Sequence, residues 1–256
     1  MTIKMKLKII ISVCFAALIF FNNSINQKLL AKTSFDSNMV SGNDNPEVLL
    51  HNRNGTKCQI ILYDPHKLTV AIKSQRPTFN NNCFFCVPAA FTSKTPKQIA
   101  GIFIERGNII NSLTDKEFNG TCIISQDSIK IMPSSFLNKN ILDNAIKYKN
   151  SLFQQFLLIN HSEIVPCLIF QERVNLRRAL IQFDNYFCVG ESNKPVTILD
   201  FQESLKSIGA INALYLDMGT YSEGWYKNHA GEKVKIGEEM INTDKQSNWL
   251  VYEKIK

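Results

Sequence analysis

The sequence has little of what marks fibrous or disordered chains. Its 256 residues include 11 Gly and 8 Pro, with no tract rich in either and no repeat of 20–50 residues. The missing tracts exclude collagen-like and low-complexity chains, and the missing repeat disfavours a solenoid or a propeller. What is present is apolar: 45% of the residues are hydrophobic and 17 are Phe, enough for a packed core.

Acidic residues are absent from the first 32 positions. That stretch contains five lysines, which account for five of the seven net positive charges of the chain. The remainder is therefore close to neutral, and it contains no run rich in Lys and Arg and no zinc-finger or RNA-recognition motif. This pattern predicts that nucleic acid is not a partner.

No apolar run reaches the roughly 20 residues that span a bilayer. The run Ile9 to Phe21 is shorter and follows Lys4, Lys6 and Lys8, the layout of a secretory signal. Because residues 22–32 contain no small-x-small cleavage triplet, an uncleaved anchor is the alternative. We therefore divide the chain into a signal peptide or N-terminal anchor (1–32), a polar linker (33–47) and a folded domain (48–256). The expected location is outside the cytoplasm, whether periplasmic, in the cell envelope or secreted, with membrane attachment only through the N-terminal segment.

Six cysteines follow the leader. An even number in an exported protein predicts at least one disulfide, although six cysteines allow 15 connectivities. Cys83 and Cys86 form a C-x-x-C pair, but no second pair and no H-x3-5-H accompanies it. A structural disulfide or two buried thiols are therefore favoured over a zinc site or a redox dithiol.

Short apolar runs separated by turn-forming residues predict many strands and few helices. One predicted helix covers Asn140–Leu152, and a second opens at Asp200 with a capping box and ends at Gly209. The predicted fold class is α+β: a single domain with a mixed, mostly antiparallel β-sheet core and a few packed helices. The predicted strands are Cys58–Tyr63, Leu68–Ile72, Ile102–Glu105, Cys122–Ser125, Ile129–Met132, Phe156–Asn160, Cys167–Gln171, Ala179–Phe183, Tyr186–Val189, Ala210–Leu216 and Trp249–Tyr252.

Asp217 comes directly after the apolar strand Ala210–Leu216. The loop that follows, up to Gly224, is rich in small and hydroxyl residues. A carboxylate at the exit of a strand into such a loop is well placed to face a ligand. The alternative is that Asp217 only caps the loop through nearby backbone amides.

Three segments resemble motifs of the phosphodiester glycosidase family. Gly209–Ser222, which reads GAINALYLDMGTYS, resembles the family's G-A-x-N-A-L-x-L-D-G-G-G-S-S. Arg177–Ile181 resembles its R-T-A-I-G, and Asn81–Phe85 resembles its N-A-G-x-F. The resemblance covers roughly residues 50–256. It departs from the family where Met218, Thr220 and Ile181 replace glycines and where Asn82-Cys83 replaces two small residues.

The resemblance implies an exported hydrolase that cleaves a sugar-1-phosphodiester or a related glycan linkage, with a phosphorylated sugar or glycan as partner. It implies Asp217 and Glu223 as catalytic residues, and a divalent cation at Asp217 is left open as a cofactor. Because bulkier residues replace glycines that let backbone approach a ligand, the alternative is a non-catalytic carbohydrate-binding envelope protein with the same fold. The substrate-binding residues that the resemblance implies are Asn81, Arg177, Arg178 and Ser222. Trp225 is added because aromatic faces stack on sugar rings, with packing in the core as the alternative.

Overall fold

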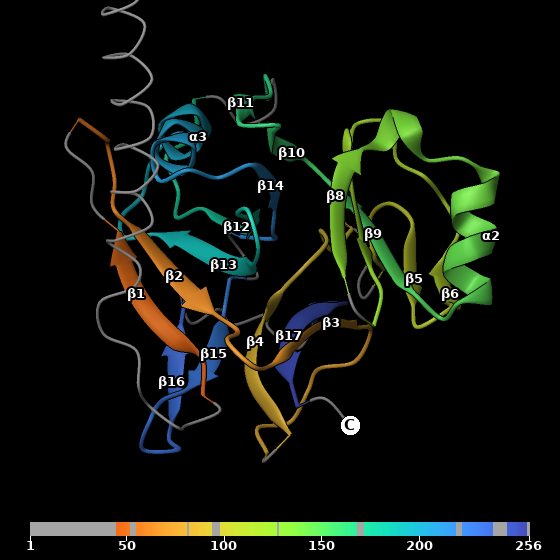
Figure 1. The fold of residues 1–256 in the computed structure, drawn as a ribbon, viewed down its shortest axis with the longest axis horizontal. Helices are drawn as coiled ribbons and strands as arrows, with labels where there is room; N and C mark the ends of the chain where they lie inside the picture. Colours follow the sequence, from red (N-terminus) through yellow and green to blue (C-terminus); the bar gives the residue numbers. More distant parts are fainter. Residues whose placement is uncertain are drawn as a thin grey trace, which may run out of the picture. The chain divides into compact units, whose positions relative to one another are not determined.

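The computed structural model describes residues 45–51, 55–80, 82–93, 98–126, 128–167, 172–218, 222–237 and 245–254. These residues form three antiparallel β-sheets and two α-helices (Figure 1). Within these residues, none of the helices has the length and apolar character needed to cross a membrane.

The first sheet has seven strands and is covered on one face by helix α3 (Ile198–Ser207). Phe201 and Leu205 of α3 pack with Ala179, Ile181 and other side chains from that face of the sheet. In spatial order its strands are β1 (Glu47–His51), β2 (Ile60–Asp64), β13 (Phe187–Ser192), β12 (Arg178–Gln182), β14 (Asn212–Tyr215), β10 (Leu157–Asn160) and β11 (Glu163–Ile164).

The second sheet has five strands, and the connection that leaves its edge strand folds back over it. Phe79 in that connection meets Trp225 edge-on, with ring centroids 5.2 Å apart, and Arg76 lies 5.2 Å above the Trp249 ring. The strands, in spatial order, are β16 (Lys233–Ile236), β15 (Gly224–Lys227), β4 (Cys83–Pro88), β17 (Trp249–Glu253) and β3 (Thr69–Lys73).

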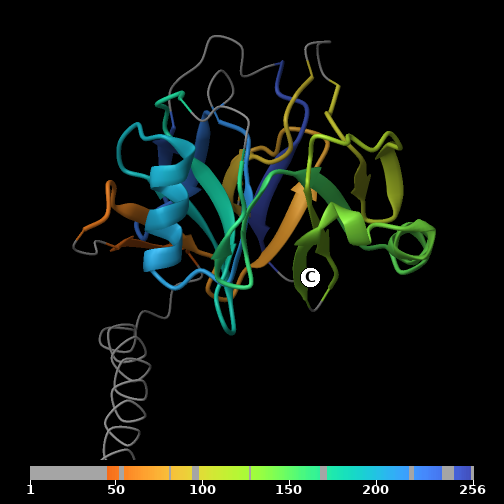
Figure 2. The ribbon, with the colours of Figure 1, turned by 90° about the horizontal axis from the view of Figure 1, so that it is seen from above.

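The third sheet also has five strands and packs against helix α2 (Lys139–Lys147) through Ala145 of the helix and Leu152 of the sheet. Helices α2 and α3 lie on opposite sides of the sheets in both views (Figure 1, Figure 2). A 3-10 turn, η1 (Ser134–Phe136), leads into α2. In spatial order the strands are β6 (Asn108–Asn111), β5 (Phe103–Glu105), β9 (Ser151–Gln155), β7 (Gly120–Ile124) and β8 (Ile129–Pro133).

All three sheets contribute to one apolar core. Leu214 from the first sheet, Phe85 and Leu250 from the second, and Phe103 and Phe153 from the third are buried in the same cluster. Burying such side chains contributes about 1.5–3 kcal/mol each. The shared core fixes the strand ends of the first and second sheets relative to each other.

The β-rich α+β fold agrees with the sequence, with differences in strand pairing, in the bounds of both helices and in several strands that were not predicted. No parallel pair occurs among the described strands, so the expected mixed pairing is wrong for this part of the chain. The first predicted helix is too long, because Lys149 adopts a φ of 54° and Leu152 belongs to β9. The second begins three residues earlier than predicted, with Thr197 as its N-cap, and ends at Gly209 (φ 90°) as expected. Most of the predicted strand Cys167–Gln171 lies outside the described residues.

The prediction of at least one disulfide is wrong. The six cysteines are all buried thiols. Cys83 and Cys86 occupy one strand, where three residues of extended chain span about 10 Å, beyond the roughly 7 Å between Cα atoms that a disulfide allows. Burial raises the pKa of the Cys83 thiol to about 11, which keeps it protonated and unreactive.

Candidate functional site

Three strand ends meet around Asp217. The Asp217 N–H donates to the Ala89 carbonyl just after β4 (2.8 Å), and Leu216 N–H donates to the Arg178 carbonyl at the start of β12 (2.9 Å). Asn248, just before β17, bonds both the N–H and the carbonyl of Ala90 (2.6 and 2.9 Å). Hydrogen bonds, as well as packing in the core, therefore fix the three chain segments around Asp217.

The Asp217 carboxyl is 4% exposed. It accepts the Thr92 N–H (3.3 Å) and also a hydrogen bond from the Gln246 side chain, whose Oε1 accepts from Thr92 Oγ1 (2.8 Å). Burial raises the pKa of Asp217 from 3.8 to about 8; the Thr92 hydrogen bond and the positive charge of Arg178 oppose that rise. A carboxyl with a pKa near 8 holds a proton at neutral pH and is able to transfer it, as a general acid requires.

Arg178 is fully buried, and its positive charge acts on the Asp217 carboxyl. Its Nε and Nη2 donate to Glu191 Oε2 (3.0 and 2.7 Å), and its Nη1 donates to the Ser222 carbonyl (3.0 Å). Gly237 (φ 73°) packs directly on this contact, since a Cβ there would lie 2.2 Å from the Ser222 oxygen. Only glycine permits that approach, so the Arg178–Ser222 contact depends on the chain next to β16.

Arg177 projects from the other face of the chain at the start of β12, because successive residues of an extended chain alternate. Its Nε donates to the Val196 carbonyl and its Nη1 to the Tyr215 hydroxyl (both 3.2 Å), and its Nη2 donates to the Arg173 carbonyl. These protein acceptors occupy a donor on every nitrogen of its guanidinium. Of the two adjacent arginines, Arg178 is the one whose contacts reach Ser222.

Of the remaining predicted site residues, some contact the Asp217–Arg178 site and others do not. Ser222 is buried and contributes its carbonyl to Arg178, while Glu223 forms an ion pair with Arg76 (2.9 Å). Trp225 is 2% exposed and packed against Phe79, so it presents no open ring face. Asn81 lies outside the described residues. The structure thus brings Asp217, Arg178 and Ser222 together and places Glu223 beside them in the chain.

Several neighbours of Asp217 were missed by the sequence reasoning. Thr92, Gln246 and Asn248 complete the hydrogen bonds around it, and Glu191 neutralises Arg178. The polar run Gln246–Asn248 directly before an apolar strand was the one available signal, since buried polar residues at a strand end require partners.

The described residues do not form a metal cage. No group of three or more His, Cys, Asp or Glu side chains is arranged to hold a metal ion within the described ranges. Hard divalent cations take about six or more oxygen ligands, whereas Asp217 supplies a single carboxylate close to the positive charge of Arg178, and Glu191 is engaged by Arg178.

A cavity of 920 Å³ lies elsewhere, between α2 and the third sheet, and it extends to β10. Its walls include Leu142, Ile146, Gln154 and Leu157, and no member of the Asp217 network. We place the candidate site by its chemistry, because the raised pKa and the buried ion pair occur at Asp217 and Arg178.

Comparison with known folds identifies the class to which this architecture is similar. Family models and curated proteins give no match. Among solved structures, the chain is similar to the catalytic domain of zebrafish N-acetylglucosamine-1-phosphodiester α-N-acetylglucosaminidase, auto-inhibited by its pro-peptide, with a TM-score of 0.55 and 14% identity over 86% of this chain and 85% of that one. It is also similar to a hypothetical protein from Synechocystis, with a TM-score of 0.51 and 11% identity over 82% of this chain and 62% of that one. At these identities the similarity establishes a distant phosphodiester glycosidase-like fold.

Proposed function

We propose that the protein is a hydrolase that cleaves a sugar-1-phosphodiester or a related glycan linkage, with Asp217 as its acid-base residue. The observation that carries this proposal is the buried Asp217 carboxyl, with a pKa of about 8, beside the Arg178–Glu191 pair. The fold supports it, because a solved neighbour is named for the same class of linkage.

In the proposed reaction a water oxygen bonds to the anomeric carbon while the bond from that carbon to the phosphate oxygen breaks. The electron pair leaves with the phosphate oxygen, and Asp217 donates its proton there. The carboxylate then recovers a proton from the attacking water, which yields a free sugar and a phosphate monoester. A residue that gives and regains a proton in this way works best with a pKa near the working pH.

Arg178 and Arg76 have different proposed roles. Arg178 is buried, so it stabilises the anionic phosphate through its charge and positions Ser222 through a hydrogen bond. Arg76 has an exposed side chain and a single carboxylate contact, with Glu223, so it is the guanidinium that substrate reaches directly. In this scheme Glu223 orients Arg76 and does not itself transfer a proton.

The test is release of free sugar from a set of sugar-1-phosphodiesters. We expect Asp217→Ala to lower turnover by roughly a hundredfold or more with its thermal unfolding still cooperative, because a positioned acid-base group is lost. Asp143→Ala, which removes an exposed carboxylate from α2, is the matched control and should keep wild-type turnover.

Full activity in Asp217→Ala would refute the role of Asp217. Sugar binding by the wild-type chain with no turnover of any substrate in the set would instead support the carbohydrate-binding alternative. Export from the cytoplasm remains part of the proposal, and its test is cell fractionation; finding the full-length chain in the cytosol would overturn it.

A further inference from the structure

Three lysines gather around aromatic rings at the end of β15. Lys227 Nζ lies 5.2 Å from the centre of the Phe79 ring and 4.6 Å from that of Phe84. Lys254 Nζ lies 5.5 Å from the Phe84 ring. Lys233, on β16, has its Nζ 5.6 Å from the Trp225 ring. We refer to Lys227, Lys233 and Lys254 as the lysine cluster.

Cation–π contacts and one hydrogen bond hold the lysine cluster in place, but they do not neutralise its charge. Lys227 and Lys233 are directly opposite each other in the β15–β16 pair, where like charges destabilise a sheet. Lys227 is only 8% exposed, and its ammonium donates to the Asn80 carbonyl (3.1 Å). No carboxylate among the described residues pairs with Lys227 or Lys233. Burying an ammonium without a counter-ion is costly, so an anion from outside the chain would relieve this strain.

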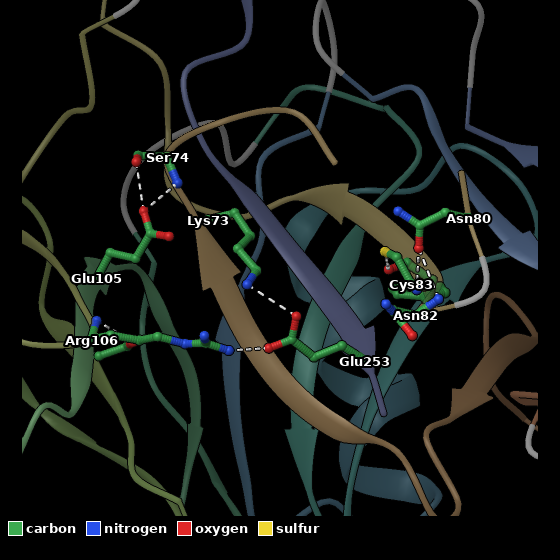
Figure 3. Close-up of polar contacts among 10 residues, drawn as sticks. Lys73, Ser74, Asn80, Asn82, Cys83, Glu105, Arg106 and Glu253 are labelled. Atoms are coloured by element: carbon green, nitrogen blue, oxygen red, sulfur yellow. Dashed lines mark hydrogen bonds and ion pairs between the residues drawn. The ribbon is translucent and has the colours of Figure 1, made fainter. Parts of the chain in front are cut away.

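Glu253, which directly precedes Lys254, is already engaged by other cations: it binds Lys73 (3.0 Å) and Arg106 (Figure 3).

The Asn80 carbonyl that receives Lys227 is itself held in place. Asn80 Oδ1 accepts from the N–H groups of Asn82 and Cys83 (2.8 and 3.1 Å), which fixes the turn into β4 (Figure 3). The acceptor of the Lys227 ammonium is therefore fixed by hydrogen bonds to the start of β4.

The lysine cluster is connected to the candidate site by β15. This strand begins directly after Ser222 and Glu223 and ends at Lys227, and five residues of extended chain span about 16 Å. Arg76, bound to Glu223, is exposed near the start of that path. A single sugar at Asp217 would not cover this length, whereas an oligomer would.

We propose that the lysine cluster binds the anionic chain of a polymeric glycan that carries repeated phosphate or carboxylate groups and extends along β15 from the linkage cleaved at Asp217. The cleavage in this statement rests on the proposed function, whereas the binding of the chain does not. A glycan is favoured over single-stranded nucleic acid, because Trp225 and Phe84 are buried and leave Phe79 (37% exposed) as the one open ring of these three, whereas a nucleic-acid strand stacks successive bases on several rings.

The test uses labelled dextran sulfate as the polyanionic glycan probe and neutral dextran as its uncharged counterpart. We expect the full chain to bind dextran sulfate in a salt-dependent manner and to ignore neutral dextran. Lys233→Gln/Lys254→Gln, two exposed positions, should bind about tenfold more weakly or worse, since charge-assisted contacts are lost. Lys130→Gln/Lys139→Gln, which removes the same charge from β8 and α2, should bind like the wild type.

Equal weakening in both double variants would show a general charge effect and overturn the proposal. So would tighter binding of a single-stranded oligodeoxynucleotide or of anionic lipid vesicles that displaces dextran sulfate. Turnover of short sugar-1-phosphodiesters, measured on the same proteins, separates the two proposals. Turnover without polymer binding refutes the lysine cluster alone, and polymer binding without turnover refutes the proposed function alone.

Discussion

At the scale of single residues, Asp217 makes stability depend on pH. Below pH 3.8 its carboxyl is protonated in both the folded and the unfolded chain, so burial carries no ionisation cost. Between about pH 4 and 8 the unfolded chain loses this proton while the folded chain keeps it, so the free energy of unfolding falls as pH rises. Above about 8 the folded carboxyl ionises too, and the penalty is constant.

Asp217→Asn keeps the shape of the side chain and removes the charge. We therefore expect this variant to unfold with a higher free energy than the wild type at pH 8, by a few kcal/mol at about 1.4 kcal/mol per pKa unit. The difference should be small near pH 4.5 and grow until about pH 8, because only the wild type loses stability over that range.

Urea unfolding of both proteins at pH 4.5, 6, 7 and 8.5 measures this difference, with Asp143→Asn on α2 as the exposed control. A gap that stays constant from pH 4.5 to 8.5 would mean that Asp217 ionises at its ordinary pKa and has no special capacity to donate a proton.

At the scale of elements, Asn248 joins β17 to the chain leaving β4. Its amide pairs with both backbone groups of Ala90 and is completely buried. Asn248→Ala leaves a buried N–H and a buried carbonyl without their partners, so we expect a loss of about 2–4 kcal/mol of unfolding free energy. Asn193→Ala, which removes exposed hydrogen bonds to Gln59, should lose less than about 1 kcal/mol.

Chemical denaturation of the two asparagine variants makes the comparison. Equal losses would show that the Asn248 bonds add nothing beyond ordinary surface contacts. A further expectation is that Asn248→Ala also lowers turnover, because the segment from Ala89 to Thr92 holds Asp217.

Local patterns predicted the elements whose signals are local. Helix α3 has its capping residues and Gly209 within its own sequence, and most of the alternating strands are bounded by turn residues. Seven strands were not predicted: β1, β4, β6, β9, β11, β15 and β16. Of these, β4 and β9 are buried at every residue, so they lack the alternation that marks a half-buried strand. The first helix was predicted to run as far as Leu152, because the apolar periodicity of the helix continues into β9.

The residues of the candidate site also fall into two groups, those that a local sequence pattern marks and those that it does not. Asp217 and Arg178 stand out because each follows or opens an apolar strand within a recognisable motif. Thr92 and Gln246 act on Asp217 from positions 154 residues apart, and Asn248 reaches Ala90 across 158 residues. No local pattern contains contacts of that range, since the sheet topology alone brings these segments together.

At the scale of the whole molecule, burial of apolar side chains stabilises the fold without the disulfides that the cysteine count predicted. The six cysteines are buried in three separate apolar clusters, where they pack as small hydrophobic residues. A chain of this length buries enough apolar surface to fold without covalent links, unlike a small secreted domain. An even cysteine count therefore did not indicate pairing here.

The thiols should be unreactive until the molecule unfolds. Thiolate is the reactive form, and burial raises the pKa of Cys83 to about 11 and moves the pKa values of Cys86 and Cys188 well above their ordinary value. In a Cys14→Ser background, we expect native protein at pH 8 to take up no iodoacetamide at its six cysteines over an hour, and denatured protein to take up six equivalents. Reductant should leave the midpoint of thermal unfolding unchanged, because no disulfide supports the fold.

Mass spectrometry of the alkylated protein gives both counts, and Asn140→Cys on the exposed side of α2 provides a thiol that should label at once. Fewer than six equivalents after denaturation without reductant would reveal a disulfide. Rapid labelling of the native protein would place a cysteine at the surface and contradict the packing of the core. The combination of no native labelling with six equivalents after unfolding is specific to this arrangement, because it requires all six thiols to be both reduced and buried.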